Sequence, residues 1–157
     1  MPFISKIEAR AYARATEIPE RVEAAVTRIF PEELRPGVSI EKTSVEGQAG
    51  DTISVIRGSL ENKEHCETTF DFILREIKTE DRRALERSTD IRIDENCVFF
   101  MRIDKQVAYL GNLTMNNEVD VVSIRIHFRD YPRCKREDAI QMIEHHIQNA
   151  GEREVED

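Results

Sequence analysis

The first segment of the chain alternates apolar and polar residues with the period of two that a half-buried β-strand requires. Within residues 3–14, one set of alternate positions holds Phe3, Ile7, Ala9, Ala11 and Ala13. The other set holds Lys6, Glu8, Arg10, Tyr12 and Arg14. The pattern therefore predicts a strand with one buried face and one face open to solvent.

A β-hairpin is predicted next. Residues 38–45 and 51–60 are strand-like runs that flank the loop EGQAG, residues 46–50. Glycine adopts the positive φ that a tight connection needs. We therefore expect the two runs to pair as antiparallel neighbours across this loop.

Three more strands are predicted in the second half of the chain, over residues 91–94, 97–104 and 119–130. In the 97–104 run, one face holds Cys97, Phe99, Met101 and Ile103, and the other holds Val98, Phe100 and Arg102. In the 119–130 run, the expected core residues are Val122, Ile124, Ile126 and Phe128, and the outer ones are Ser123, Arg125, His127 and Arg129. Alternation of this kind favours a sheet that is covered on one side only.

Helical spacing of apolar residues appears in four other stretches, which cover residues 16–30, 62–78, 80–87 and 135–149. Thr16 is the expected N-cap of the first helix and Thr79 that of the third. Strands and helices follow one another in mixed order. We therefore predict a single α+β domain over residues 1–150, a two-layer sandwich with helices on one face of a mostly antiparallel mixed sheet. Residues 151–157 are expected to form a flexible acidic tail.

Charge is distributed unevenly over these predicted elements. The chain has 157 residues, 34% of them charged, and a net charge of −8, which argues against a protein that coats nucleic acid non-specifically. The cations nevertheless gather at outer strand positions, as Lys6, Arg10, Arg14, Arg57, Arg102, Arg125 and Arg129. Most carboxylates lie instead on the predicted helices and at the termini.

The sequence thus predicts one basic and partly aromatic sheet face on an acidic protein. Arginine binds phosphate through two parallel hydrogen bonds, and exposed rings such as Tyr12 and Phe100 stack on unpaired bases. His127 lies among the same positions. The alternative interpretation is a solvated face, because basic side chains on exposed strands also discourage edge-to-edge pairing.

The stretch MRIDKQVAYLG, residues 101–111, follows directly on a predicted strand. In the functional interpretation, Lys105 and Gln106 lie at the rim of the basic face and reach a phosphate or a ribose hydroxyl. In the structural interpretation, Asp104 accepts backbone N–H bonds and Lys105 pairs with it. Tyr109 is expected to be a half-buried packing residue because its neighbours are apolar.

This stretch resembles the signature RFDKQ-AYLG of an archaeal family of predicted RNA-binding domains that is described as a predicted exosome subunit. ARATEIPERVEAAVTRIFP and VSIRIHFRDYPRCKREDAI are similar to its first and last strand–helix units. The resemblance implies a fold similar to that of the large-subunit ribosomal protein that binds 5S rRNA. Departures from the family pattern are Ile103, Val107, Gln48 and Asp51.

Cysteine usage and hydropathy indicate where the protein resides. Cys66, Cys97 and Cys134 form an odd, scattered set, which favours a reducing cytoplasm over a disulfide framework. No stretch reads as a signal peptide or approaches membrane-spanning length. We expect a cytoplasmic protein that does not contact a membrane.

Metal binding and catalysis are the first competing interpretations. The adjacent pairs His65-Cys66 and His145-His146 diverge by about 100° on a helix, so neither pair chelates a metal. A magnesium-dependent nuclease would need Asp51, Asp94 and Asp104 to gather around one ion. No nucleophile, base or phosphate-loop motif accompanies them, so we predict no enzyme, no cofactor and no metal.

A protein-interaction subunit is the other alternative, since Tyr12, Val98 and Phe100 would give the open face an apolar centre for a partner or a second copy. The prediction favoured by the sequence is a non-enzymatic RNA-binding module in an RNA-processing or ribosome-related assembly. Its partners are RNA and, within such an assembly, other proteins. The predicted RNA-binding residues are Lys6, Arg10, Tyr12, Arg14, Phe100, Arg102, Lys105, Gln106, Arg125, His127 and Arg129.

Overall fold

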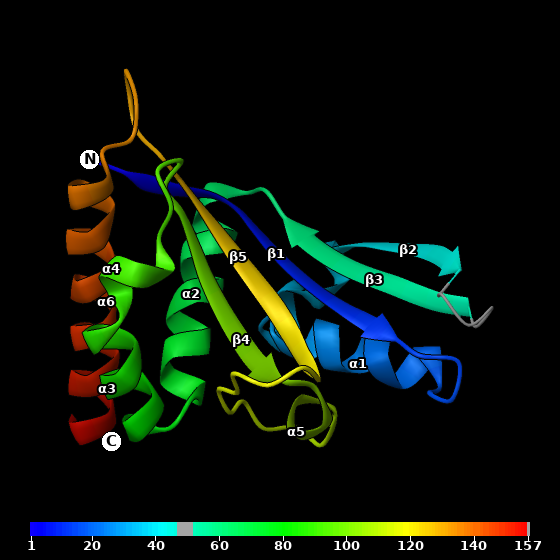
Figure 1. The fold of residues 1–157 in the computed structure, drawn as a ribbon. Helices are drawn as coiled ribbons and strands as arrows, with labels where there is room; N and C mark the ends of the chain where they lie inside the picture. The colour runs from blue at the N-terminus through cyan, green and yellow to red at the C-terminus, as the bar shows by residue number, and fades with distance from the viewer. Residues whose placement is uncertain (47–51, 157) are drawn as a thin grey trace.

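A five-stranded sheet forms one layer of the protein in the computed structural model, which describes residues 1–46 and 52–156 (Figure 1). The strand order is β2-β3-β1-β5-β4, and all four pairings are antiparallel. The strands are β1 (Phe3–Ala13), β2 (Ser39–Glu46), β3 (Thr52–Leu60), β4 (Val98–Asp104) and β5 (Val121–Arg129). The predicted mixed sheet is thus purely antiparallel in the described residues.

Helices form the second layer and cover one face of this sheet (Figure 1). They are α1 (Pro19–Arg28), α2 (Lys63–Glu76), α3 (Thr79–Arg87), α4 (Thr89–Arg92), α5 (Lys105–Tyr109) and α6 (Arg136–Glu156), together with a 3-10 helix at Glu32–Gly37. α1 packs on β1 and β3, while α2 packs on β1 and on α6. This arrangement confirms the predicted two-layer α+β architecture.

The hydrophobic core lies between the two layers. Along β4 and β5, alternate side chains are buried as the sequence pattern predicted, with Phe99, Met101 and Ile103 inward on β4. Phe70 of α2 meets Phe99 and Phe128 in edge-to-face contacts, with ring centroids 6.3 Å apart in both pairs. These contacts anchor α2 to β4 and β5 on the covered face of the sheet.

Glycine at one sheet position sets how closely α1 approaches the sheet. A Cβ at Gly58 of β3 would lie 3.2 Å from side-chain atoms of both Val26 and Val38. Such contacts are tighter than ordinary van der Waals separation, so a larger residue would push α1 away from β3. Gly58 therefore allows the helix layer to close onto the β3 side of the sheet.

Several predicted boundaries need correction. β1 has a register shift between Ile4 and Lys6, so Ile4 rather than Phe3 faces the core. α1 begins at Pro19 with Ile18 as its N-cap, and Thr16 lies before it. Residues 91–94 do not form a strand, because α4 takes up Ile91, which is 82% exposed.

The caps of α2 and α3 and the end of α6 also differ from the sequence predictions. Asn62 caps α2 by accepting a hydrogen bond from the backbone N–H of His65, and Lys78 rather than Thr79 is the N-cap of α3. α6 continues to Glu156 instead of ending near residue 149. The hairpin-loop residues Gly47 and Gln48 lie outside the described residues, as do the rest of 47–51. Flexibility of residues 151–157 stays a prediction.

Two of the three cysteines are paired, contrary to the expectation of a scattered set without a disulfide. Cys97 and Cys134 are joined by a disulfide that links the start of β4 to the segment before α6. Cys66 is free and buried, and burial raises the pKa of its thiol to about 11. No helix within residues 1–46 and 52–156 is long and apolar enough to cross a membrane.

Candidate functional site

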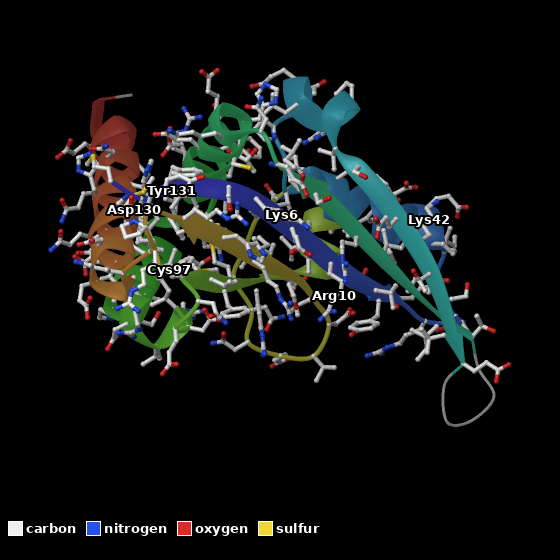
Figure 2. The ribbon with its side chains drawn as sticks, turned by 90° about the horizontal axis from the view of Figure 1, so that it is seen from above. Lys6, Arg10, Lys42, Cys97, Asp130 and Tyr131 are labelled. Carbon is white, nitrogen blue, oxygen red and sulfur yellow. A yellow bond between two sulfur atoms is a disulfide. The ribbon has the colours of Figure 1, made fainter. Side chains whose placement is uncertain are left out.

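The uncovered side of the sheet is the candidate site, and we call it the open sheet face. It is formed by outward side chains of the four strands β3, β1, β5 and β4. Its residues are Lys6, Glu8, Arg10, Tyr12, Arg57, Val98, Phe100, Arg102, Ser123, Arg125 and His127. Figure 2 shows Lys6 and Arg10 along β1, with the helices on the other side of the sheet.

Strand register brings arginines from different parts of the chain into neighbouring positions. Arg57 of β3 pairs with Arg10 of β1, which pairs with Ser123 of β5, and Ser123 pairs with Arg102 of β4. The next row along the strands contains Glu8, Arg125 and Phe100. Because neighbouring strands lie about 4.8 Å apart, these guanidinium groups cover a continuous area of the face.

Glu61 lies 3.7 Å from Nζ of Lys6 at the margin of this area, and Glu8 neutralises part of the centre. The side chain of Glu8 is 14% exposed, and its Oε1 lies 2.8 Å from Nε2 of His127. The other contacts are longer, at 3.6 Å to Nε of Arg57 and 3.8 Å to Nζ of Lys6. The charges of Lys6 and Arg57 are therefore partly compensated within the protein.

Arg10, Arg102 and Arg125 differ from that group. Within the described part of the chain, no carboxylate oxygen lies within 4.0 Å of their guanidinium nitrogens. The guanidinium carbon of Arg10 lies 5.7 Å from the ring centroid of Tyr12, and that of Arg125 lies 5.7 Å from the centroid of Phe100. These contacts orient the guanidinium groups but leave their charge available to an anion.

The positive charge of the open sheet face also lowers the pKa of a neighbouring residue, Arg92. Burial lowers the pKa of the Arg92 guanidinium, and the nearby charge of Arg102 lowers it further. A small hollow lies on the open sheet face over β3, β1 and β5. It is lined by Arg10, Arg57, Arg125, Ser123 and Glu8. The guanidinium groups and the hydroxyl of this hollow attract phosphate oxygens, while the carboxylate of Glu8 opposes them.

The remaining predicted residues lie around this face. Arg14 follows the end of β1 and is exposed, and its charge reaches Asp120. Arg129 lies at the end of β5, in register with Phe3 at the start of β1. Because β1 and β5 are antiparallel, Arg14 and Arg129 mark opposite ends of the face.

Lys105 requires a correction, because the structure does not place it at the rim. Its side chain is 4% exposed, and its Nζ lies 2.7 Å from Oδ1 of Asp120 and 2.8 Å from Oε2 of Glu17. Nζ also donates to the backbone carbonyl of Tyr12 at 2.8 Å. With three acceptors around a buried ammonium, Lys105 holds the end of β1 to α5 instead of reaching a ligand.

The cause is the helix that starts at this point. Asp104 is the N-cap of α5 and accepts a 2.9 Å hydrogen bond from the backbone N–H of Val107, as the structural interpretation expected. The other part of that interpretation is wrong, because Lys105 pairs with Glu17 and Asp120 rather than with Asp104. The turn directs Lys105 inward and leaves Gln106 exposed, with Nε2 3.0 Å from Oδ2 of Asp120. Sequence adjacency alone gave no signal for Glu17 or Asp120 as partners.

Asp120 shows how this cluster is balanced electrostatically. Desolvation by burial raises its pKa, but hydrogen bonds from Lys105 and Gln106 and the charges of Lys105 and Arg14 outweigh that effect. The net result is a pKa below the ordinary carboxyl value. Asp120 is therefore held in its ionised form by the same lysine that the functional interpretation assigned to a ligand.

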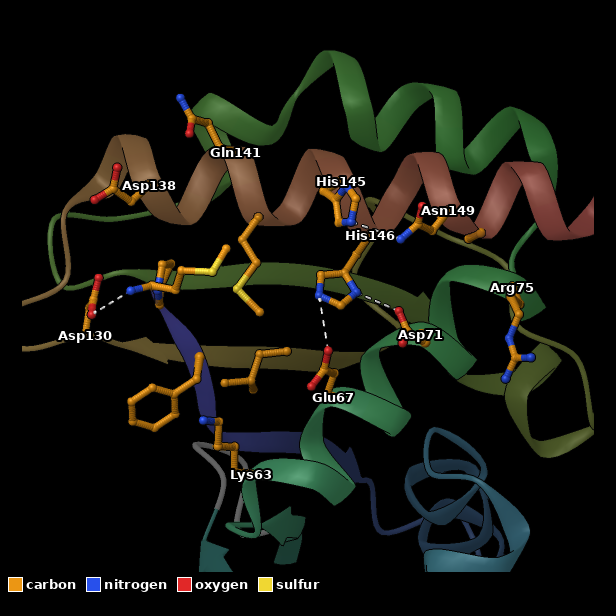
Figure 3. A pocket seen from close by; sticks show the side chains of 16 residues that line it. Lys63, Glu67, Asp71, Arg75, Asp130, Asp138, Gln141, His145, His146 and Asn149 are labelled. Carbon is orange, nitrogen blue, oxygen red and sulfur yellow. Dashed lines mark hydrogen bonds and ion pairs between the residues drawn. The ribbon is translucent and has the colours of Figure 1, made fainter.

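A separate cavity of about 750 Å³ lies between α2, α6 and the start of β1 (Figure 3). Nδ1 of the buried His146 is 2.7 Å from Oδ1 of Asp71, and Nε2 is 4.0 Å from Oε1 of Glu67. His145 also lines the cavity and contacts Asn149. Sequence reasoning missed this cavity, although the four-residue spacing of Lys63, Glu67, Asp71 and Arg75 on α2 was a usable signal.

The structure does not gather residues for a metal or a nuclease centre in its described part. No group of three or more His, Cys, Asp or Glu side chains there is arranged to hold a metal ion. Asp94 and Asp104 lie at opposite ends of β4, and Asp94 accepts hydrogen bonds from the backbone N–H groups of Asn96 and Val98. Asp51, the third predicted carboxylate, lies outside the described residues.

Comparison with known proteins agrees with the charge of the open sheet face in indicating RNA. A family model described as RNA binding matches residues 6–128. The chain is 31% identical over 138 residues to "RNA-binding protein PAB1135" of Pyrococcus abyssi, a match that covers 87% of this chain and 89% of that relative. It is also 26% identical over 144 residues to an uncharacterised protein, MJ0213, of Methanocaldococcus jannaschii, covering 90% of this chain and 95% of that one.

Solved structures of archaeal proteins share the fold. The crystal structure of AF2318 from Archaeoglobus fulgidus superposes with a TM-score of 0.78 at 25% identity, over 91% of this chain and 99% of that one. Mth689 from Methanothermobacter thermautotrophicus, a DUF54 protein, gives 0.74 at 28% identity, over 92% and 98%. With the family model matched over most of its length, the chain belongs to the family described as RNA binding.

Proposed function

We propose that this protein binds RNA through the open sheet face. The observation that carries the proposal is that Arg10, Arg102 and Arg125 come from three adjacent strands and have no carboxylate partner within the described residues. A guanidinium group without an internal anion is suited to bind a phosphate oxygen through charge-assisted hydrogen bonds. RNA supplies such oxygens at every nucleotide.

The net charge of −8 does not oppose this function, because the charges of the two layers are segregated. Within the described residues, the open sheet face has five cationic side chains, Lys6, Arg10, Arg57, Arg102 and Arg125, and fewer carboxylates, with Glu8 at its centre, Glu61 beside Lys6 and Glu41 of β2 beside Arg57. Phosphate responds to the local potential within about a Debye length, roughly 8 Å at physiological salt. The acidic helices lie on the other side of the sheet and steer RNA toward one face.

Support from relatives is of two kinds. The family description and the printed name of the Pyrococcus protein both refer to RNA binding. The MRIDKQVAYLG motif resembles a family described as a predicted exosome subunit, and this resemblance supports a place in an RNA-processing or ribosome-related assembly. The RNA-binding residues that we propose are Lys6, Arg10, Tyr12, Arg14, Phe100, Arg102, Gln106, Arg125, His127 and Arg129.

The test is a double charge reversal, Arg102→Glu with Arg125→Glu, measured by fluorescence anisotropy with labelled RNA. We expect RNA binding to be lost, because each reversal replaces an attraction to phosphate by a repulsion, while stability stays unchanged because both side chains are exposed. The matched control is Arg83→Glu with Arg87→Glu on α3, which changes the net charge equally on the helix layer. Its RNA affinity should change far less.

The competing function, docking of a protein partner, gives different results. It predicts that Phe100→Asp abolishes a salt-tolerant association, because an apolar contact is lost from the centre of the face. Equal RNA binding by the wild type and the Arg102/Arg125 double variant would contradict the proposal. Size-exclusion chromatography with and without RNA then separates self-association from RNA binding.

A further inference from the structure

Two aromatic rings on the open sheet face are exposed to an unusual degree for residues within a sheet. Tyr12 of β1 is 50% exposed and Phe100 of β4 is 37% exposed. Each ring carries a guanidinium group 5.7 Å from its centroid, from Arg10 and Arg125 respectively. Each ring–arginine pair therefore combines a flat apolar surface with a positive charge.

The two pairs are separated along the diagonal of the face. Glu8 lies four residues before Tyr12 on β1. Its cross-strand partner on β5 is Arg125, whose partner on β4 is Phe100. With about 3.4 Å per residue along a strand and about 4.8 Å between strands, the two Cα atoms lie roughly 17 Å apart. Bases repeat about every 3.4 Å when stacked and more widely when extended, so roughly four to six nucleotides span the two rings.

The surface between the rings suits a sugar–phosphate backbone. Arg10, Ser123 and Arg102 occupy one cross-strand row between Tyr12 and Phe100. Two of these side chains are arginines without an internal carboxylate partner among the described residues, and Ser123 offers a hydroxyl. A backbone that runs from one ring to the other therefore crosses phosphate-binding groups along its path.

Unpaired bases are the ligand that such rings select. In a duplex each base already stacks on its neighbours, and an exposed protein ring has no base face to contact. In a single strand, stacking on an aromatic side chain is available for any base. The β2 edge of the sheet also repels the second strand of an RNA duplex, because the exposed carboxylate of Glu41 lies there beside Arg57.

We propose that the open sheet face selects single-stranded RNA, with one base stacked at Tyr12, a second at Phe100 and a site of roughly four to six nucleotides. This inference rests on the proposed function and names its substrate class. Arg10 and Arg125 contribute twice, as phosphate contacts and as the flat groups that extend each ring. In this proposal the two rings select single-stranded over double-stranded RNA, and the arginines attract the sugar–phosphate backbone.

The experiment compares a single-stranded RNA with the duplex of the same sequence, using wild type, Tyr12→Leu and Phe100→Leu. Loss of one stacking contact is expected to weaken single-strand binding between about fivefold and about 150-fold. Duplex binding should be weaker in the wild type and unaffected by either substitution. Tyr12→Phe and Phe100→Tyr keep a ring and should keep the affinity for the single strand.

Tyr109 supplies a matched control on the helix side of the molecule. Its ring is 42% exposed and the guanidinium carbon of Arg21 lies 5.6 Å from its centroid, so it has the same ring–arginine contact away from the open sheet face. Tyr109→Leu should leave single-strand affinity unchanged. Since the chain has three tyrosines and no tryptophan, quenching of tyrosine fluorescence on binding reports stacking directly and should fall in Tyr12→Phe.

Outcomes of this experiment separate the inference from the proposed function. If duplex and single strand bind equally, or if the leucine variants bind like wild type, the inference is overturned. RNA binding that still disappears in the Arg102/Arg125 double variant would then leave the proposed function standing. If wild type binds neither RNA, the proposed function fails and the inference fails with it. Far-UV circular dichroism of each variant verifies that the sheet has formed.

Discussion

Two cationic regions of this protein have opposite surroundings. On the open sheet face, Arg10 and Arg125 contact aromatic rings and have no carboxylate partner within the described residues. At the end of β1, beside Tyr12, the ammonium of Lys105 is buried and contacts two carboxylates and a backbone carbonyl. Both regions carry the residue types expected of a phosphate site, but only the first leaves its charge uncompensated.

The difference shows how to separate a binding cation from a structural one. A buried ammonium that has lost its water must find its partners within the fold, and those partners then exclude an external anion. An exposed guanidinium held against a ring keeps its hydrogen-bond donors free. We therefore assign RNA binding to the arginines and structural stabilisation to Lys105.

Substitution of Lys105 should produce the largest effect on stability. Lys105→Met leaves the carboxylates of Glu17 and Asp120 without their cation, and we expect a loss of about 2 to 4 kcal/mol in the free energy of unfolding. Urea denaturation measures it. Lys135→Met, at an exposed lysine, is the control and should change stability by less than about 0.5 kcal/mol. RNA affinity of the folded Lys105→Met protein should persist, and its selective loss would break the comparison.

Removal of the internal anion on the open face should have a moderate effect in the opposite direction. Glu8 compensates Lys6 and Arg57 and contacts His127, so Glu8→Gln frees positive charge for RNA. We expect affinity to rise about fivefold, which corresponds to about 1 kcal/mol. Glu86→Gln on α3 changes the net charge equally and should have little effect. Unchanged or weaker binding of Glu8→Gln would show that Glu8 is a positioning residue rather than a competitor.

The pH dependence of stability should show the smallest effect, at Asp120. Its pKa is lower in the folded protein than its ordinary value of 3.8, so its contribution is complete above that value and is lost as the pH falls through the folded pKa. Asp120→Asn should therefore reduce stability at neutral pH, by less than about 1 kcal/mol for this partly exposed group, and should match wild type in strong acid. In the Lys105→Met background the same substitution should have a smaller pH-dependent effect, because only Gln106 and Arg14 then lower the pKa of Asp120.

Sequence reasoning located the strands of the open face well for a physical reason. One face of β4 and of β5 is buried and the other is not. Apolar and polar residues therefore alternate with a period of two from Phe99 to Ile103 and from Val122 to Phe128. The outward positions of Arg102 and Arg125 followed from the same alternation. Charge segregation between the layers was predictable because it depends only on which face each residue occupies.

Other features depended on contacts that local patterns do not contain. Ile91 and Ile93 alternate like a strand, but two apolar positions cannot distinguish a strand from a single helical turn such as α4. The inward turn of Lys105 depends on Glu17, which lies 88 residues earlier in the chain. The register shift in β1 and the disulfide between Cys97 and Cys134 likewise arise from tertiary structure.

The salt dependence of RNA affinity tests the central claim most directly. If Arg10, Arg102 and Arg125 contact phosphates, three contacts at about 0.7 each give a slope of roughly −2 for log affinity against log salt concentration. The account predicts that slope for the wild type with a single-stranded RNA and a markedly shallower one for the Arg102→Glu, Arg125→Glu variant. RNA binding by the wild type that stays constant from low to moderate salt would contradict it.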